Sequence, residues 1–171
     1  MGIVMNTTTR LMLIALLSLP LMAACDKAPT ETTEDAAVAL APLSAPTTND
    51  DNEWGTYLSA VVTRNMGDVT SSPYLYYLPS SDSEGFEGAH ERLREEIENA
   101  MQRGIVEGNL VAFGSPESAM MADIIVGAFE KVGPGSMKGV RLLFIGAPAD
   151  SERVEQAVTP AGVDYVFVEA K

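Results

Sequence analysis

The sequence predicts an α/β domain: a small doubly wound parallel four-stranded sheet flanked by helices and preceded by an N-terminal amphipathic helix. Four short apolar stretches alternate with three stretches of helical periodicity, the pattern of βαβ crossovers and a parallel sheet. The third and fourth apolar stretches are uninterrupted, as in strands whose sheet is covered on both faces. We assign this domain to residues 53–171.

The first element of the domain is a predicted helix. Apolar residues recur along it at the spacing of one helical face, and they are Trp54, Tyr57, Leu58, Val61 and Val62. Asp51 or Asn52 is in position to cap its first turn. We expect Trp54 to anchor packing rather than to bind a ligand.

The alternation of strands and helices begins after this helix. An apolar run at 74–78 lies between Pro73 and Pro79 and indicates a strand. A helix is predicted over 86–103, with apolar residues inward and charged residues outward, and Gly104 ends it.

The rest of the chain repeats this alternation. The predicted elements are a strand at 109–113, a helix at 116–132, a strand at 140–145, a helix at 151–159 and a strand at 165–168. The helix at 116–132 is apolar around much of its circumference, so we expect it to be well buried. Right-handed crossovers then form a small sandwich, for which we expect the strand order 2-1-3-4.

Residues 1–24 have the features of a secretory signal peptide. Arg10 is their only charged residue, an apolar run from Leu11 to Ala24 follows, and small residues end it. A helix that spans a bilayer requires about 20 apolar residues, so this run is too short to be a membrane anchor.

Residues 21–25, which read Leu-Met-Ala-Ala-Cys, resemble the lipobox of bacterial lipoproteins. In that family the cysteine sulfur receives a diacylglyceryl group, signal peptidase II cuts before the cysteine, and the new amino group is often acylated, for example with palmitate. Met22 departs from the family pattern, in which leucine is commoner. The resemblance implies that Cys25 is lipidated and attaches the chain to a lipid bilayer. An ordinary cleaved signal with a chance cysteine is the alternative.

The resemblance also implies a location in the bacterial cell envelope, lipid-anchored and facing the periplasm. Asp26 resembles the signal that retains enteric lipoproteins in the inner membrane, and the outer membrane stays open because other lineages follow different rules. Residues 25–52 then form the lipidated cysteine and a flexible tether, because proline, threonine, alanine and acidic residues dominate them and few could pack.

Charge and cysteine content exclude several classes of function. The 171 residues carry 11 Lys and Arg against 24 Asp and Glu, which gives a net charge of −13. Such a surface repels nucleic acid and gains nothing from an anionic lipid leaflet. A single cysteine also excludes an internal disulfide.

Candidate recognition residues follow three of the predicted strands, because ligands of such sheets bind beyond the carboxyl ends of the strands. They are Ser80, Ser81, Asp82 and Glu84 in the first loop, Gly114 and Ser115 in the second, and Asp150 in the third. The first loop is the best candidate because it is the longest, although plain flexibility would also explain its composition. We expect Ser115 and Asp150 to cap helices rather than to bind anions or catalyse a reaction.

The sequence predicts no catalytic residue, no metal ligand and no cofactor site. His90 is the only histidine, it stands among acidic residues, and no Gly-x-Ser-x-Gly elbow accompanies it. Several His or Cys ligands, which transition metals prefer, are absent, as are the glycine-rich phosphate-binding motifs.

Three functional hypotheses remain. The first is a non-catalytic binding or interaction module tethered in the envelope, with an envelope protein as its partner. One version is an immunity or inhibitor protein, whose acidity would suit a basic toxin. The second is a small-molecule-binding protein or an unrecognised enzyme that uses the three loops. The third is a mainly structural domain.

Overall fold

The computed structural model describes residues 41–171, so the predicted signal peptide, Cys25 and most of the predicted tether lie outside the described residues. The elements, in chain order, are α1 (Asp51–Arg64), β1 (Tyr74–Tyr77), α2 (Phe86–Arg103), β2 (Leu110–Gly114), α3 (Ser118–Phe129), β3 (Arg141–Gly146), α4 (Pro148–Val158), a 3-10 turn (Thr159–Ala161) and β4 (Asp164–Glu169). None of the helices in this range combines the length and apolar character that crossing a bilayer requires.

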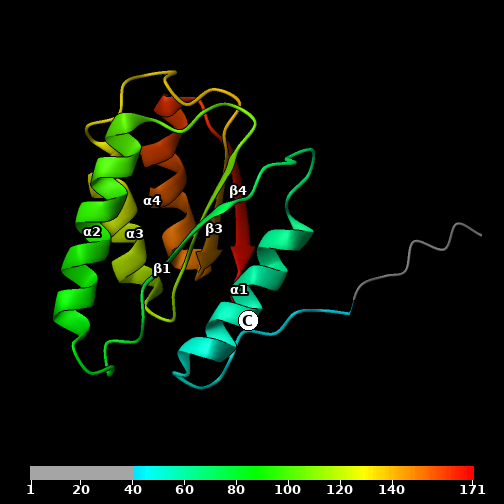
Figure 1. The fold of residues 1–171 in the computed structure, drawn as a ribbon, viewed down its shortest axis with the longest axis vertical. Helices are drawn as coiled ribbons and strands as arrows, with labels where there is room; N and C mark the ends of the chain where they lie inside the picture. The colour runs from blue at the N-terminus through cyan, green and yellow to red at the C-terminus, as the bar shows by residue number, and fades with distance from the viewer. Residues whose placement is uncertain (1–40) are drawn as a thin grey trace, which may run out of the picture. The chain divides into compact units, whose positions relative to one another are not determined.

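The four strands form one parallel sheet with helices on both faces, which confirms the predicted α/β class (Figure 1). The strand order is β1-β2-β3-β4, so the expected order 2-1-3-4 is wrong. The sequence around β1 explains the difference, because Pro73 and Pro79 bracket a strand of only four residues. Proline cannot donate to a ladder and is confined to edges and strand ends, which places β1 at the edge.

The observed order also decides how the helices are distributed. Strands that are consecutive in the sequence are also neighbours in the sheet, so the three crossovers run in the same direction across it. Because βα crossovers of this kind are right-handed, their helices all lie on one face of the sheet. Residues of α2, α3 and α4 share one buried cluster with this face, which we call the three-helix face. The opposite face, which we call the α1 face, is covered by the leading helix and not by a crossover.

The three-helix face contains the largest fully buried side chains, among them Phe113 and Phe144. Helix α3 lies between α2 and α4 on this face and is well buried, as its apolar sequence predicts. It spans Ser118–Phe129, shorter than the predicted 116–132. Glu117 precedes the first turn with non-helical backbone angles, and its carboxylate accepts from the Ser81 N–H in the loop after β1.

On the α1 face, all five residues predicted to form the inner side of the first helix are buried. The cap of α1 is Asp50 and not Asp51 or Asn52, because the Asp50 carboxylate accepts hydrogen bonds from the N–H groups of Asn52 and Glu53 at 2.9 and 3.0 Å. The helix packs closely on the sheet. A Cβ atom built on Gly114 would lie 2.3 Å from a methyl carbon of Leu58.

Residues 41–50, which we call the strap, pack on the folded domain although they fall within the predicted tether. Leu43 and Ala45 contact the cluster of the α1 face. The Ala45 N–H donates to the Lys171 carbonyl at 2.7 Å, and Arg64 donates to the Ala41 carbonyl at 2.6 Å. The folded domain therefore extends upstream of residue 53.

Candidate functional site

The first and second loops at the carboxyl edge of the sheet are joined by one carboxylate. Glu117 accepts hydrogen bonds from the Ser81 N–H at 2.8 Å and the Ser81 hydroxyl at 2.7 Å, and a longer one from Ser80 at 3.4 Å. The Ser81 N–H is the main cause that lowers the pKa of Glu117, and partial burial opposes it. Ser80 and Ser81 therefore serve to fix the loop.

Ser115 is buried and has a structural role. Its hydroxyl donates to the Leu78 carbonyl and accepts from the Glu117 N–H, both at 2.8 Å. Helix α3 begins three residues later, at Ser118, so Ser115 closes the turn before the helix and does not occupy the expected cap position.

Asp150 joins the first turns of α3 and α4. Helix α4 already begins at Pro148, so Asp150 lies in its first turn, and the expectation that it caps the helix is wrong. Its carboxylate accepts from the Ser118 hydroxyl at 2.7 Å and from Arg153 at 2.8 Å. The Ser118 hydroxyl in turn accepts from the Ala147 N–H at 2.8 Å, which fixes the end of β3.

The remaining candidates differ in their surroundings. Asp82 is exposed and accepts from the Asn49 amide of the strap at 3.2 Å. Glu84 is exposed. Gly114 is buried under Leu58 of α1, so it is a packing position without room for a ligand. Most polar candidates at this edge are thus already engaged with the protein itself.

A hollow of about 290 Å³ remains at the carboxyl edge, between the strap and the second and third loops. Its lining contains no charged side chain, and its members are Ala45, Pro46, Thr47, Thr48, Asn49, Trp54, Ser115, Pro116, Ser118, Gly146, Ala147 and Ala170. The indole N–H of Trp54 donates to the Thr48 carbonyl at 3.0 Å, so the tryptophan anchors the strap over this hollow.

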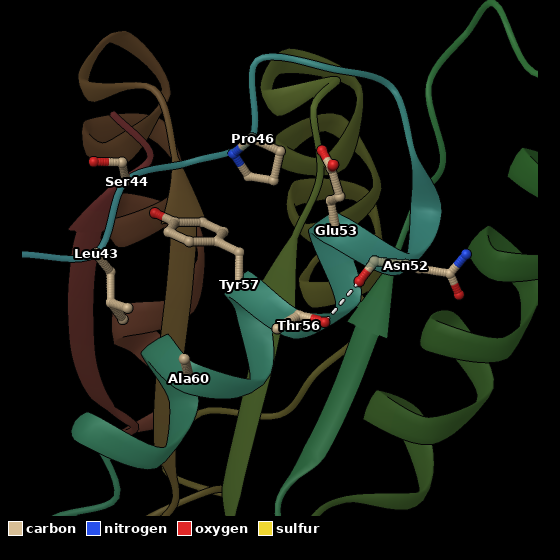
Figure 2. A pocket seen from close by; sticks show the side chains of 8 residues that line it. All are labelled: Leu43, Ser44, Pro46, Asn52, Glu53, Thr56, Tyr57 and Ala60. Atoms are coloured by element: carbon tan, nitrogen blue, oxygen red, sulfur yellow. Dashed lines mark hydrogen bonds between the residues drawn. The ribbon is translucent and has the colours of Figure 1, made fainter.

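A larger groove, of about 480 Å³, lies between the strap and the outer side of α1 (Figure 2). Figure 2 shows the Tyr57 ring beneath the strap, near Ser44 and Pro46, with Leu43 and Ala60 beyond it. The lining is mainly apolar, and burial raises the pKa of the Tyr57 phenol.

A third hollow, of about 390 Å³, lies against β4 and shares Leu43 and Tyr57 with the groove. The strap therefore has an open depression on each side. We call these two depressions, together with the strap residues 43–46 between them, the strap surface.

Sequence analysis missed the strap surface because its residues fall in a stretch that resembles a linker. A signal was present: Leu43 is an apolar residue between Pro42 and Pro46, and prolines hold the backbone extended at low entropic cost. The first loop, by contrast, is long and rich in serine, which is typical of a recognition loop.

Within residues 41–171, no three His, Cys, Asp or Glu side chains are close enough to hold a metal ion. His90 is half-buried, and its ring packs on Phe86 with centroids 5.8 Å apart. Comparisons with protein-family models, with curated proteins and with solved structures gave no match.

Proposed function

We propose that this chain is a lipid-anchored binding module of the bacterial cell envelope, held at the membrane by acylated Cys25 and without a catalytic role of its own. The anchor rests on the lipobox resemblance of residues 21–25. The binding role rests on the strap surface, which is hollow and mainly apolar, whereas the polar side chains of the carboxyl edge are engaged internally.

The contrast between these two surfaces carries the proposal. A catalytic site requires polar groups free to meet a substrate in a defined geometry. The Glu117 carboxylate is instead bound to Ser81, the Ser115 hydroxyl to backbone groups, and the Asp150 carboxylate to Ser118 and Arg153. The strap surface belongs to the described segment nearest in sequence to Cys25, so a partner bound there would be held close to the anchored end of the domain.

The anchor is tested by comparing the full chain with the Cys25→Ala variant in the native host. We expect the full chain in the membrane fraction, with its N-terminal peptide starting at a diacylglyceryl cysteine, and the variant released from the membrane. An intact Met1 or a free thiol at position 25, read by mass spectrometry, would overturn the anchor.

The binding role is tested by photo-crosslinking in intact cells. A photoreactive residue at Thr56, in the groove, should form a discrete adduct, whereas one at Glu95, an exposed residue of α2 away from the groove, should not. Equal labelling from both positions would contradict a binding role for the strap surface.

A small-molecule ligand is the second candidate, because the groove of about 480 Å³ falls in the size range of ligand pockets. A thermal-shift screen with the full chain distinguishes it, since a ligand at a hundred times its dissociation constant adds about 2.7 kcal/mol to stability.

An immunity or inhibitor role is the third candidate, and the net charge of −13 favours it. It predicts that the partner crosslinked from Thr56 is a basic protein.

A further inference from the structure

The sheet has two edges, and the chain protects only one of them. The β1 edge is four residues long and lies between Pro73 and Pro79, features that blunt an edge against further pairing. The β4 edge is six residues long, contains no proline and pairs only with β3 among the described strands.

The backbone hydrogen bonds to β3 show which residues of β4 point their N–H and C=O groups toward β3 and which point them outward. The N–H groups of Asp164 and Ala170 donate to carbonyl groups at the two ends of β3, at 2.8 and 2.9 Å. Successive residues of a strand direct their backbone groups to opposite sides. Tyr165, Phe167 and Glu169 therefore direct their N–H and C=O groups outward, away from the sheet.

One outward carbonyl group just after β4 already accepts a hydrogen bond from the strap. The Lys171 carbonyl receives the Ala45 N–H of the strap at 2.7 Å. No other backbone hydrogen bond within residues 41–171 reaches the outer side of β4. The strap thus covers only the carboxyl end of an edge that is otherwise open.

The flanks of β4 would accommodate the side chains of an added strand. Its four central residues, 165–168, are apolar and half-buried. The hollow of about 390 Å³ lies on the α1 side of this strand and includes Phe167 and Val168. Alternate side chains of an incoming strand would fill this hollow, and the others would pack beside Tyr165 on α4.

Charges of both signs stand around the edge. Asp164 and Glu169, at the ends of the strand, are paired with Arg141 and Lys171, and Arg64 lines the hollow beside the strand. Glu155 of α4 is close enough to add to the rise that burial causes in the pKa of the Tyr165 phenol, and it has no ion-pair partner among the described residues. The charge preference comes from the chain as a whole: with a net charge of −13, a second copy is repelled and a basic segment is attracted.

We propose that the β4 edge binds an extended, basic segment of a partner protein, which adds as a fifth strand beside Tyr165, Phe167 and Glu169. This inference rests on the proposed binding role but not on the lipid anchor. The outward backbone groups supply the hydrogen bonds, and the net negative charge of the chain favours a basic segment.

The test uses the full chain, purified as the cell produces it, and a synthetic peptide of alternating lysine and valine about ten residues long. We expect hydrogen exchange of residues 164–169 to slow when the peptide binds. A glutamate–valine peptide should bind at least about tenfold more weakly, the equivalent of about 1.4 kcal/mol. Methylating alternate peptide nitrogens should abolish binding without altering the protein.

Two variants at one exposed position separate the backbone from the charge. Glu169→Pro removes an outward N–H that the β3 ladder does not use, so it should weaken binding about tenfold. Glu169→Gln keeps that N–H and should weaken binding less. Circular dichroism verifies that both variants fold. If Glu169→Pro does not fold, the methylated peptide still tests the backbone hydrogen bonds to the outer side of β4.

Several results would overturn the inference. Unchanged affinity for the methylated peptide, or slowed exchange at another segment, would show that the backbone of β4 is not the binding element. A dimer by sedimentation, with residues 164–169 protected without peptide, would assign the edge to a second copy. A crosslink from Thr56 together with an unprotected β4 would retain the proposed binding role and refute only the edge inference.

Discussion

The two faces of the sheet are built from the same strands but are covered to different degrees. On the three-helix face, α2, α3 and α4 enclose Phe113 and Phe144 completely. On the α1 face, one helix and the strap share the covering, and hollows remain on both sides of the strap. A hollow of about 600 Å³ also lies between α3 and α4, so the faces differ in how completely their large side chains are enclosed and not in whether hollows are present. We therefore expect the three-helix face to supply most of the stability.

The largest expected effect comes from truncating matched leucines on the two faces, Leu142 and Leu143, which are neighbours in β3 and are both fully buried. Leu142→Ala should fall near the upper end of about 2–5 kcal/mol, because three helices pack on its face and cannot easily close the cavity. Leu143→Ala on the α1 face should fall near the lower end of that range, because a single helix can shift inward. Urea unfolding monitored by circular dichroism measures both values. Equal costs for the two variants would remove the distinction between the faces.

The next effect tests how closely α1 approaches the sheet. Gly114→Ala should destabilise the domain by about 1–3 kcal/mol, because its Cβ would lie 2.3 Å from a Leu58 methyl carbon. Adding Leu58→Ala should relieve that clash, so the double variant should lose less stability than the sum of the two single variants. Strict additivity in the same unfolding measurement would refute this contact.

A smaller effect concerns the start of α1. Asp50→Ala should cost about 1 kcal/mol, because it removes the acceptor of two N–H groups in the first turn. Hydrogen exchange of residues 51–54 should quicken while the three-helix face stays protected. Asn52→Ala is the matched control and should change stability by less than about 0.5 kcal/mol. A larger loss of stability in Asn52→Ala than in Asp50→Ala would show that Asp50 is not the residue that caps α1.

The smallest effect is a pH dependence at the carboxyl edge. The pKa of Glu117 is lowered in the folded state, so the ionised carboxylate stabilises the fold. This stabilisation is fully present above the ordinary pKa of glutamate and is lost as the pH falls through the lowered pKa. Between these two pKa values the unfolded chain binds more protons, so stability rises with pH. Unfolding measured from about pH 3 to pH 6 should show this rise, which Glu117→Gln should flatten. An unchanged pH profile in the variant would contradict the role of Glu117.

The sequence predicted the class of the fold and the elements well, because apolar periodicity reports which residues are buried. The inner residues of α1 and the burial of α3 follow directly from that periodicity. The strand order could not be predicted in the same way, because a βα crossover has the same apolar periodicity whether it leads to an adjacent or to a more distant strand. The prolines around β1 were the one local feature that indicated an edge.

The candidate site was predicted less well, and for a physical reason. Ser80, Ser115 and Asp150 have the residue types of a recognition site, but their partners, Glu117, Leu78 and Ser118, lie in other loops or elements. Only the three-dimensional arrangement shows that these groups satisfy one another. The strap was missed because its docking depends on Lys171, at the opposite end of the described domain.

The strand order also has a consequence for how the molecule folds. Each strand pairs with the strand that follows it in the chain, so every ladder closes a loop of one βα unit, and the entropy lost on closing such loops is modest. The sheet can therefore grow unit by unit, because each new strand pairs with the strand that precedes it in the chain. The hydrogen bond between Ala45 and Lys171 has the largest sequence separation of the backbone hydrogen bonds among the described residues. We expect docking of the strap to be the final step of assembly, and the first contact to open under load.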